Sequence, residues 1–413
     1  MKKTAIFFGV NSLTDEIVEN YSSQLDLLYI IDNNSKYWTG GGEFFFNLRV
    51  EPPSDRIKSA DYIIIVATAY RGEMEMQLRT EFDISSDKII YLPWPNKLED
   101  YVGKFPKILA ITLGADSCIN SCLMCPQHIE RPHTSCWLDL DILKKAVSEM
   151  IHEDSIFVIS CMSEPLLAPN LLDAIKIIRE KKPKSQIMID TCGSVYDEKV
   201  MEELFKYINK IKISLNVITA EDYRVLMGTD NFDAVVSNIW KSKSYIDTHN
   251  LDVTIIVQIS KFKKLKYSEY YQFAKQFKDK GIWVHLNDIY DFNAFPKFGE
   301  LSSKLKNEGF EPVLEVKQGR YPCASLFGSF NLVEDGCYYP CHYVSSHGMS
   351  HVEDKVYSLG AASQTTLNDV CEQLGSLQEM HLKDDYSCLI CRDCNAWTLG
   401  IEYFRHKLTA FKG

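Results

Sequence analysis

Six short apolar segments alternate with stretches of helical periodicity between residues 104 and 288, and this alternation constrains the fold more than any other feature. Asp139 precedes one helical stretch and predicts its N-cap. Strands that alternate with helices form parallel sheets, so we expect an α/β fold, a (β/α)6 partial TIM barrel over residues 104–290. Its chemistry would sit at the C-terminal ends of the strands. The six segments are 108–113, 156–161, 186–190, 210–215, 253–259 and 283–287.

A separate α/β unit is expected over residues 1–96. Its predicted strands are 5–9, 27–31, 62–67 and 89–92, with a helix over 13–21, and Pro93 and Pro95 mark its end. This pattern predicts a Rossmann-like α/β domain. Asp32 follows the second strand, where a dinucleotide fold places a ribose-binding acid. However, the residues after the first strand lack the G-x-G-x-x-G pattern, so a structural or recognition role is favoured over dinucleotide binding.

Length, charge and hydropathy exclude several classes of protein. A chain of 413 residues suggests two to three domains. The net charge of −11 argues against nucleic acid as a partner. The longest apolar run, 62–70, is too short to span a membrane, and the N-terminal apolar run is too short for a signal peptide. We therefore expect a soluble, cytoplasmic protein, in which the thirteen cysteines serve metal binding or catalysis.

Three cysteines lie together just after the first predicted barrel strand. Cys118, Cys122 and Cys125 have the spacing C-x3-C-x2-C. Three thiolates on one loop can hold three irons of a [4Fe–4S] cluster and leave the fourth iron open to a small molecule. Zinc would more often take four ligands in C-x2-C pairs. The spacing therefore favours an iron–sulfur cluster with an open site.

This motif resembles that of the radical S-adenosylmethionine (SAM) superfamily, and the resemblance covers residues 104–288. Asn120 is displaced by one place from the family's common motif, and Met124 replaces an aromatic residue. The resemblance implies that the reduced cluster cleaves SAM to methionine and a 5′-deoxyadenosyl radical, which abstracts a hydrogen from the substrate. It also implies a reducing partner such as flavodoxin or ferredoxin.

Other family motifs imply SAM contacts. Family members carry Gly-Gly-Glu-Pro after the second strand, and here Met162-Ser163-Glu164-Pro165 keeps the glutamate that would hold the SAM amino group. The alternative for Glu164 is a solvated loop residue. Ser214 and Asn216 lie at a strand end similar to the one that contacts SAM in the family. Gln258 is either another SAM contact or an amide at the edge of the core.

A second set of cysteines lies in the C-terminal region, residues 321–400, and resembles a SPASM or twitch domain with an auxiliary cluster. We expect one auxiliary [4Fe–4S] cluster, with the spacing C-x17-C followed by C-x2-C that is similar to twitch-domain dehydrogenases of aminoglycoside biosynthesis. Two alternatives stay open: a second auxiliary cluster that also uses Cys337, Cys371 and Cys388, and a zinc knuckle. The expected ligands are Cys323, Cys341, Cys391 and Cys394.

Two further cysteines are candidate hydrogen donors. Cys161 and Cys192 lie at or just after predicted strand ends, although buried cysteines are commonly structural. Residues near other strand ends could contact substrate without a motif to support them: Asp190, Asn216, Asn287, Asp288 and Tyr290. His128 and His133 are more simply loop residues. His342 adjoins Cys341 and either supports a cluster ligand or is incidental.

The substrate stays open at this level. The preferred prediction is a small-molecule or carrier-linked sugar substrate that is oxidised or epimerised. A maturase of a ribosomal precursor peptide is the main alternative, although residues 1–96 do not resemble the winged-helix domain of many such enzymes. A glycyl-radical activating enzyme and a non-enzymatic iron–sulfur carrier or interaction protein are the remaining alternatives.

Overall fold

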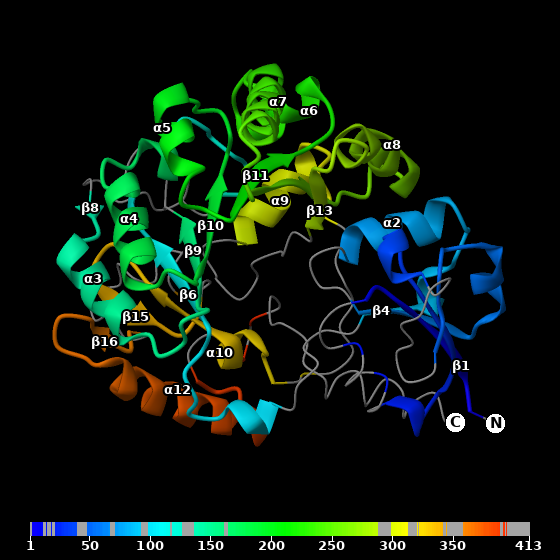
Figure 1. Cartoon of the computed structure of the whole chain (residues 1–413), viewed down its shortest axis with the longest axis horizontal. Coiled ribbons are helices and arrows are strands. Elements are labelled where there is room, and N and C mark those ends of the chain that lie inside the picture. Colours follow the sequence, from blue (N-terminus) through cyan, green and yellow to red (C-terminus); the bar gives the residue numbers. More distant parts are fainter. Residues whose placement is uncertain are drawn as a thin grey trace.

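Two sheets and the helices around them make up the described part of the protein (Figure 1). A computed structural model describes residues 2–10, 14, 18, 21–38, 48–66, 71–91, 98–115, 118–125, 136–160, 164–287, 299–312, 320, 322–341, 344, 358–388, 391–392 and 394. The predicted helix 13–21, residues 40–42, 161–163, 288 and 290, and His128, His133 and His342 lie largely or wholly outside these ranges.

The N-terminal sheet is entirely parallel, with strand order β3-β2-β1-β4-β5. This is the strand order of the Rossmann fold, and all four predicted strands are present. Strand β4 is buried along its whole length and β1 from its second residue onward, as expected for a parallel sheet covered on both faces. The elements are β1 (Thr4–Phe8), β2 (Asp26–Ile31), η1 (Ser35–Tyr37), β3 (Val50–Glu51), η2 (Asp55–Ser59), β4 (Tyr62–Ile65), α2 (Arg71–Thr80), η3 (Ser86–Lys88) and β5 (Ile89–Tyr91).

The second sheet contains the six predicted strands in sequence order, all parallel, as the order β13-β12-β11-β10-β9-β6. The predicted α/β class and parallel sheet are confirmed. The strands are β6 (Ile108–Thr112), β9 (Ile156–Ser160), β10 (Gln186–Thr191), β11 (Lys210–Asn216), β12 (Thr254–Ser260) and β13 (Trp283–Asn287). A separate two-stranded ribbon pairs β7 (Gly114–Ala115) with β8 (Cys136–Trp137).

Helices pack along one face of this sheet (Figure 1). Alternate strand residues are buried against them, such as Ile211, Ile213 and Leu215 of β11, while the residues between them are only half-buried. As predicted, Asp139 caps the first of these helices through bonds to the backbone N–H groups of Asp141 and Ile142. The helices are α3 (Leu140–Glu149), η6 (Pro165–Leu167), α4 (Leu171–Lys181), α5 (Glu198–Leu204), α6 (Ala220–Met227), α7 (Phe232–Thr248) and α8 (Tyr267–Lys278).

The C-terminal region continues the same sheet. Strand β14 (Ser329–Leu332) pairs in parallel with β6, and β15 (Cys337–Tyr339) and β16 (Gly360–Ala361) follow in antiparallel. These strands are only two to four residues long, which is too short for a recognisable pattern of apolar residues in the sequence. The remaining elements are η4 (Leu98–Tyr101), α9 (Gly299–Asn307), α10 (Ser325–Gly328) and α12 (Leu367–Leu382).

The N-terminal unit contacts the larger sheet through α2, which lies against α8 and β13 (Figure 1). An ion pair joins Glu75 of α2 to Lys261, which follows β12, at 3.7 Å, and the two side chains are only 7% and 8% exposed. None of the helices in the described part of the chain combines the length and apolar character needed to cross a membrane.

Candidate functional site

The first cysteine loop is held by the end of α6. The backbone N–H groups of Ser121 and Leu123 donate to the carbonyls of Met227 and Leu226 at 2.9 and 2.8 Å. Gly228 ends α6 with a left-handed φ of 70°, and a Cβ there would lie 2.8 Å from the Cβ and carbonyl oxygen of Ser121. Only glycine tolerates both the conformation and the close approach. The loop that carries Cys118, Cys122 and Cys125 is therefore fixed against the helix.

Asn120 anchors the same loop from inside. Its side chain is buried, and its Oδ1 accepts bonds from the hydroxyls of Thr229 at 3.3 Å and Ser194 at 3.5 Å. Ser194 in turn lies 3.2 Å from the hydroxyl of Tyr223, and burial raises the pKa of Tyr223 to about 12. The sequence identified Asn120 only as a displaced motif residue. Its partners are 74 and 109 residues away, so sequence spacing could not reveal this role.

Glu164 lies buried where the loop after β9 meets the end of β10. Its Oε1 accepts bonds from the hydroxyl of Thr191 at 2.5 Å and the N–H of Leu166 at 3.1 Å, and its Oε2 accepts the N–H of Cys192 at 2.7 Å. The side chain is 1% exposed, so Glu164 is not the solvated loop residue of the alternative interpretation. It also caps the short helix η6.

Cys192 lies beside this carboxylate. Burial raises the pKa of its thiol, and the charge of Glu164 raises it further, so Cys192 is a neutral thiol at physiological pH. A neutral thiol is the form that can give a hydrogen atom. Cys161, the other candidate donor, falls outside the described residues.

A group of hydrogen-bonded side chains lies at the ends of β11 and β12, where Asn216 contacts both Gln258 and Ser260. Asn216 has a positive φ of 64° at a register shift in β11. Its Oδ1 accepts from Ser260 at 3.0 Å and Gln258 at 3.4 Å, and its Nδ2 donates to the sulfur of Met227 at 3.5 Å. Because Met227 also holds the cysteine loop, this group and the loop are structurally connected. Ser214 is half-buried and lies opposite Gln258 in the β11–β12 pairing.

A polar row crosses the face of the sheet that the helices leave open. Asp190 of β10 and Lys212 of β11 are partners in the strand register and form an ion pair at 2.7 Å, with side chains 26% and 23% exposed. In the next row, Ser214, Gln258 and His285 are opposite one another on β11, β12 and β13. Sequence reasoning named Asp190 but missed Lys212, because a lysine in mid-strand has no motif.

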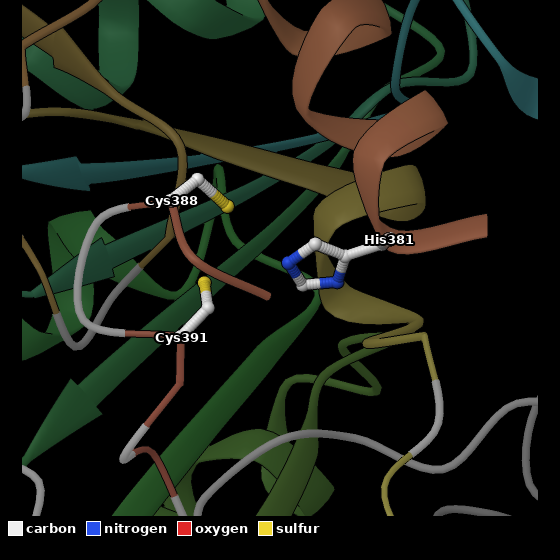
Figure 2. Close-up of side chains that lie close together, drawn as sticks. All are labelled: His381, Cys388 and Cys391. Carbon is white, nitrogen blue, oxygen red and sulfur yellow. The ribbon is translucent and has the colours of Figure 1, made fainter. Parts of the chain in front are cut away.

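The second group of cysteines brings His381, Cys388 and Cys391 together. One ligand atom from each lies within 4.8 Å of the others, and Figure 2 shows the imidazole facing both sulfurs. A hydrogen bond from Cys391, supported by His381, lowers the pKa of Cys388 to about 5. The same bond and burial raise the pKa of Cys391, as do the nearby groups Cys341 and Cys323. Cys388, which the sequence suggested only as a ligand of an alternative second cluster, therefore lies beside Cys391.

The other C-terminal cysteines differ in their surroundings. Cys337 and Cys371 are 3% and 4% exposed, and Cys337 packs in an apolar cluster with Val333, Tyr339 and Val344. Burial raises the pKa of Cys371 to about 11. Cys394 donates its backbone N–H to the carbonyl of Cys391 at 3.3 Å, so it follows the pair on a tight turn.

Comparison with known proteins identifies the central region. Residues 114–266 match the family model described as the radical SAM superfamily. The chain contains a radical SAM domain. The matched range includes the first cysteine loop, Glu164, Ser214, Asn216 and Gln258. Radical SAM domains use a [4Fe–4S] cluster, which the cysteine spacing predicted, and SAM, which the family resemblance implied.

Similar proteins are distant in sequence. An uncharacterized protein, MJ0804 of Methanocaldococcus jannaschii, is 29% identical over 116 residues, which are 27% of this chain and 40% of that relative. The crystal structure of BtrN with AdoMet and 2-DOIA is 14% identical, with a TM-score of 0.44, and the match covers 71% of this chain and 94% of BtrN. Native anSMEcpe with AdoMet and a bound peptide is 15% identical, with a TM-score of 0.48, and the match covers 74% of this chain and 98% of anSMEcpe.

The residues of the radical SAM domain fit its cofactors. Cys118, Cys122 and Cys125 are half-buried on a fixed loop, which suits ligands that bind a cluster and leave one face accessible. The carboxylate of Glu164 accepts three hydrogen bonds from a hydroxyl and two backbone N–H groups, and the thiol of Cys192 is its fourth neighbour. An ammonium group would take the position that this thiol occupies, because a carboxylate has about four lone-pair positions.

Proposed function

We propose that this protein is a radical SAM enzyme that acts on a small-molecule or carrier-linked sugar substrate, with oxidation or epimerisation as the outcome. The observation that carries the proposal is the attachment of the Cys118–Cys122–Cys125 loop to Met227, which also contacts the Asn216 group at the strand ends. When bound there, the cofactors supply reductive cleavage of SAM and a carbon radical that abstracts hydrogen. The chain's own residues bind, orient and protect the reactants.

Glu164 and the β11–β12 strand ends would bind SAM. The carboxylate of Glu164 would accept the SAM ammonium group in place of the Cys192 thiol, and burial of the carboxylate strengthens that bond. Ser214 and Gln258 are half-buried neighbours on one face and would contact the ribose or carboxylate of SAM. Asn216 is 3% exposed and bonded to three side chains, which supports a positioning role for it.

The polar row on the open sheet face supports a polar substrate. The Asp190–Lys212 pair offers an anionic acceptor and a cationic donor one row below Ser214 and Gln258. Hydroxyl and amine groups of a sugar would hydrogen-bond to such groups. The all-parallel N-terminal sheet, which is not a winged helix, also supports this substrate class over a precursor peptide. We further propose that the strands that bear these groups curve into a partial barrel.

The C-terminal region would hold one auxiliary [4Fe–4S] cluster. We propose Cys323, Cys341, Cys388 and Cys391 as its ligands, because Cys391 interacts with the other three. Four protein thiolates leave no open iron, so this cluster would transfer electrons rather than bind substrate. Oxidation would use it as electron acceptor, whereas epimerisation would use a hydrogen donor such as Cys192.

Release of 5′-deoxyadenosine tests the proposal. The protein is reconstituted anaerobically with iron and sulfide, mixed with SAM and dithionite, and the nucleoside is measured by chromatography. We expect slow release that is lost in Cys122→Ala, and about eight irons per chain from two clusters. Cys388→Ala should lose about four of these irons while Cys394→Ala keeps them. Absence of release from a fully loaded protein would contradict the enzymatic proposal.

A further inference from the structure

His381 has one ring nitrogen bonded to the backbone and the other directed at the second cysteine group. We infer that His381 donates its Nε2–H to a sulfur of the auxiliary cluster and is not itself a ligand. This inference rests on the proposed auxiliary cluster. Figure 2 shows the imidazole with its outer nitrogen toward Cys388 and Cys391, and the nitrogen nearer the backbone turned away.

A backbone hydrogen bond decides the tautomer. The N–H of Cys323 donates to Nδ1 of His381 at 3.3 Å. A backbone N–H is always a donor, so Nδ1 must be the unprotonated acceptor, and in a neutral imidazole the proton is then on Nε2. A protonated Nε2 has no lone pair for a metal ion. The bond from Cys323 thus makes His381 a donor toward the cluster.

The surroundings of Nε2 leave sulfur as its acceptor. His381 is 0% exposed, so water cannot reach the ring freely, and Nε2 has no oxygen or nitrogen partner among the residues that the structure describes. A buried N–H without an acceptor destabilises the folded protein. The sulfurs of Cys388 and Cys391 are the polar atoms in front of it, and thiolates that ligate iron are acceptors.

The ring is held in this orientation from several sides. His381 lies in the last turn of α12, and Gln378, one turn earlier, is fully buried. Gln378 donates to the carbonyl of Leu326 and accepts the N–H of Gly103, both at 2.9 Å. The ring of Tyr386 packs edge-on against His381, with 5.1 Å between the ring centres. A ring fixed in this way can present its N–H at a constant angle.

A hydrogen bond to a cluster sulfur stabilises the more negative, reduced cluster. Hydrogen bonds to the sulfurs are among the factors that set iron–sulfur reduction potentials. His381 would therefore raise the potential of the auxiliary cluster and make it a better electron acceptor. In an oxidative reaction this favours electron transfer from the substrate radical to the cluster.

The test separates donation from ligation. The full chain is made with Cys118, Cys122 and Cys125 all changed to Ala, so that only the auxiliary cluster contributes iron and an EPR signal. His381→Asn in this background keeps an acceptor oxygen near the position of Nδ1 but removes the outer N–H. His381→Gln places an amide N–H near the position of Nε2. Iron content and the midpoint potential, from an EPR-monitored redox titration, are measured for each.

We expect all three proteins to keep about four irons. At a fixed potential, His381→Asn should lower the reduced-to-oxidised ratio on the order of tenfold, which is about 59 mV for one electron, and His381→Gln should restore part of it. Loss of iron in His381→Asn, or an unchanged ratio with the cluster intact, would overturn the inference. Absence of iron from the background protein with His381 in place would instead show that the proposed auxiliary cluster is wrong, and the inference with it.

Discussion

The carboxylate of Glu164 accepts the backbone N–H of Cys192 at 2.7 Å, and this bond joins two strand ends of the central sheet. The same carboxylate caps η6 and accepts the hydroxyl of Thr191. A residue expected to hold SAM therefore also holds the ends of β9 and β10 together. Cofactor binding and local structure depend on one side chain.

Glu164→Gln should weaken both functions. The amide presents an N–H₂ group to at least one donor, which leaves a buried polar group unpaired at a cost of about 1–3 kcal/mol. It also removes the charge opposite the SAM ammonium, so we expect SAM affinity to fall at least tenfold while iron content is kept. Equilibrium dialysis with labelled SAM and thermal unfolding measure the two effects. Glu180→Gln, at a side chain 72% exposed on α4, is the matched control. Unchanged SAM affinity would remove Glu164 from the binding site.

Gly228→Ala should displace the first cysteine loop. The substitution combines a left-handed conformation, which costs about 1–2 kcal/mol for alanine, with a contact of 2.8 Å to Ser121. Gly281→Ala is the control, because Gly281 has a φ of 73° and nothing within 4 Å of the added Cβ. We expect the first variant to lose cluster iron and SAM cleavage and the second to lose only stability. Equal iron content in the two variants would show that the loop is not fixed by this contact.

Lys261→Met should loosen the N-terminal unit. It leaves Glu75 charged and buried without this partner, and breaking such a pair costs about 3–5 kcal/mol. We expect a lower melting temperature and faster limited proteolysis. The double variant Lys261→Met/Glu75→Leu should recover much of the loss, because it removes both charges. A single variant as stable as the parent would show that the pair does not hold the two parts together.

Cys388 and Cys371 should react very differently in the metal-free protein. Cys388, with a pKa of about 5, is a thiolate at pH 7, whereas Cys371, with a pKa of about 11, is a neutral thiol. Thiolates are the reactive form, so a pulse of iodoacetamide at pH 7 should label Cys388 first. Its labelling should slow as the pH falls toward 5.

Mass spectrometry of the labelled peptides measures both rates. Cys391→Ala removes the hydrogen bond that lowers the pKa of Cys388, so its labelling at pH 7 should slow. Equal labelling of Cys371 and Cys388 at pH 7 would contradict the opposite shifts.

The six central parallel strands and four of the N-terminal strands were predictable because their apolar runs are dense and regular. The run 283–287 matches β13 at both ends, and the other predicted strands differ by one or two residues at an end. Asp139 was predictable as a cap because capping depends on the residues that directly follow it. The first cysteine loop was identified by local spacing for the same reason.

Long-range contacts were not predictable from one sequence. Cys388 and Cys394 are equally spaced about Cys391, so spacing alone could not show that Cys388 lies beside Cys391 and His381. The bond from Cys323 to His381 spans 58 residues. The contacts of Asn120 and Lys212 could not be predicted from their local sequence, because their partners come from other strands and loops.

The parallel pairing of β14 with β6 places the segment between Cys323 and Cys337 beside the strand that leads to the first cysteine loop. The C-terminal region is thus not an appendage that can be trimmed away. A chain shortened to residue 312 would leave β6 as an open edge, with unpaired backbone groups that attract strands from other molecules. Such a truncated protein would aggregate, and any ancestor without this region would have needed another way to cover that edge.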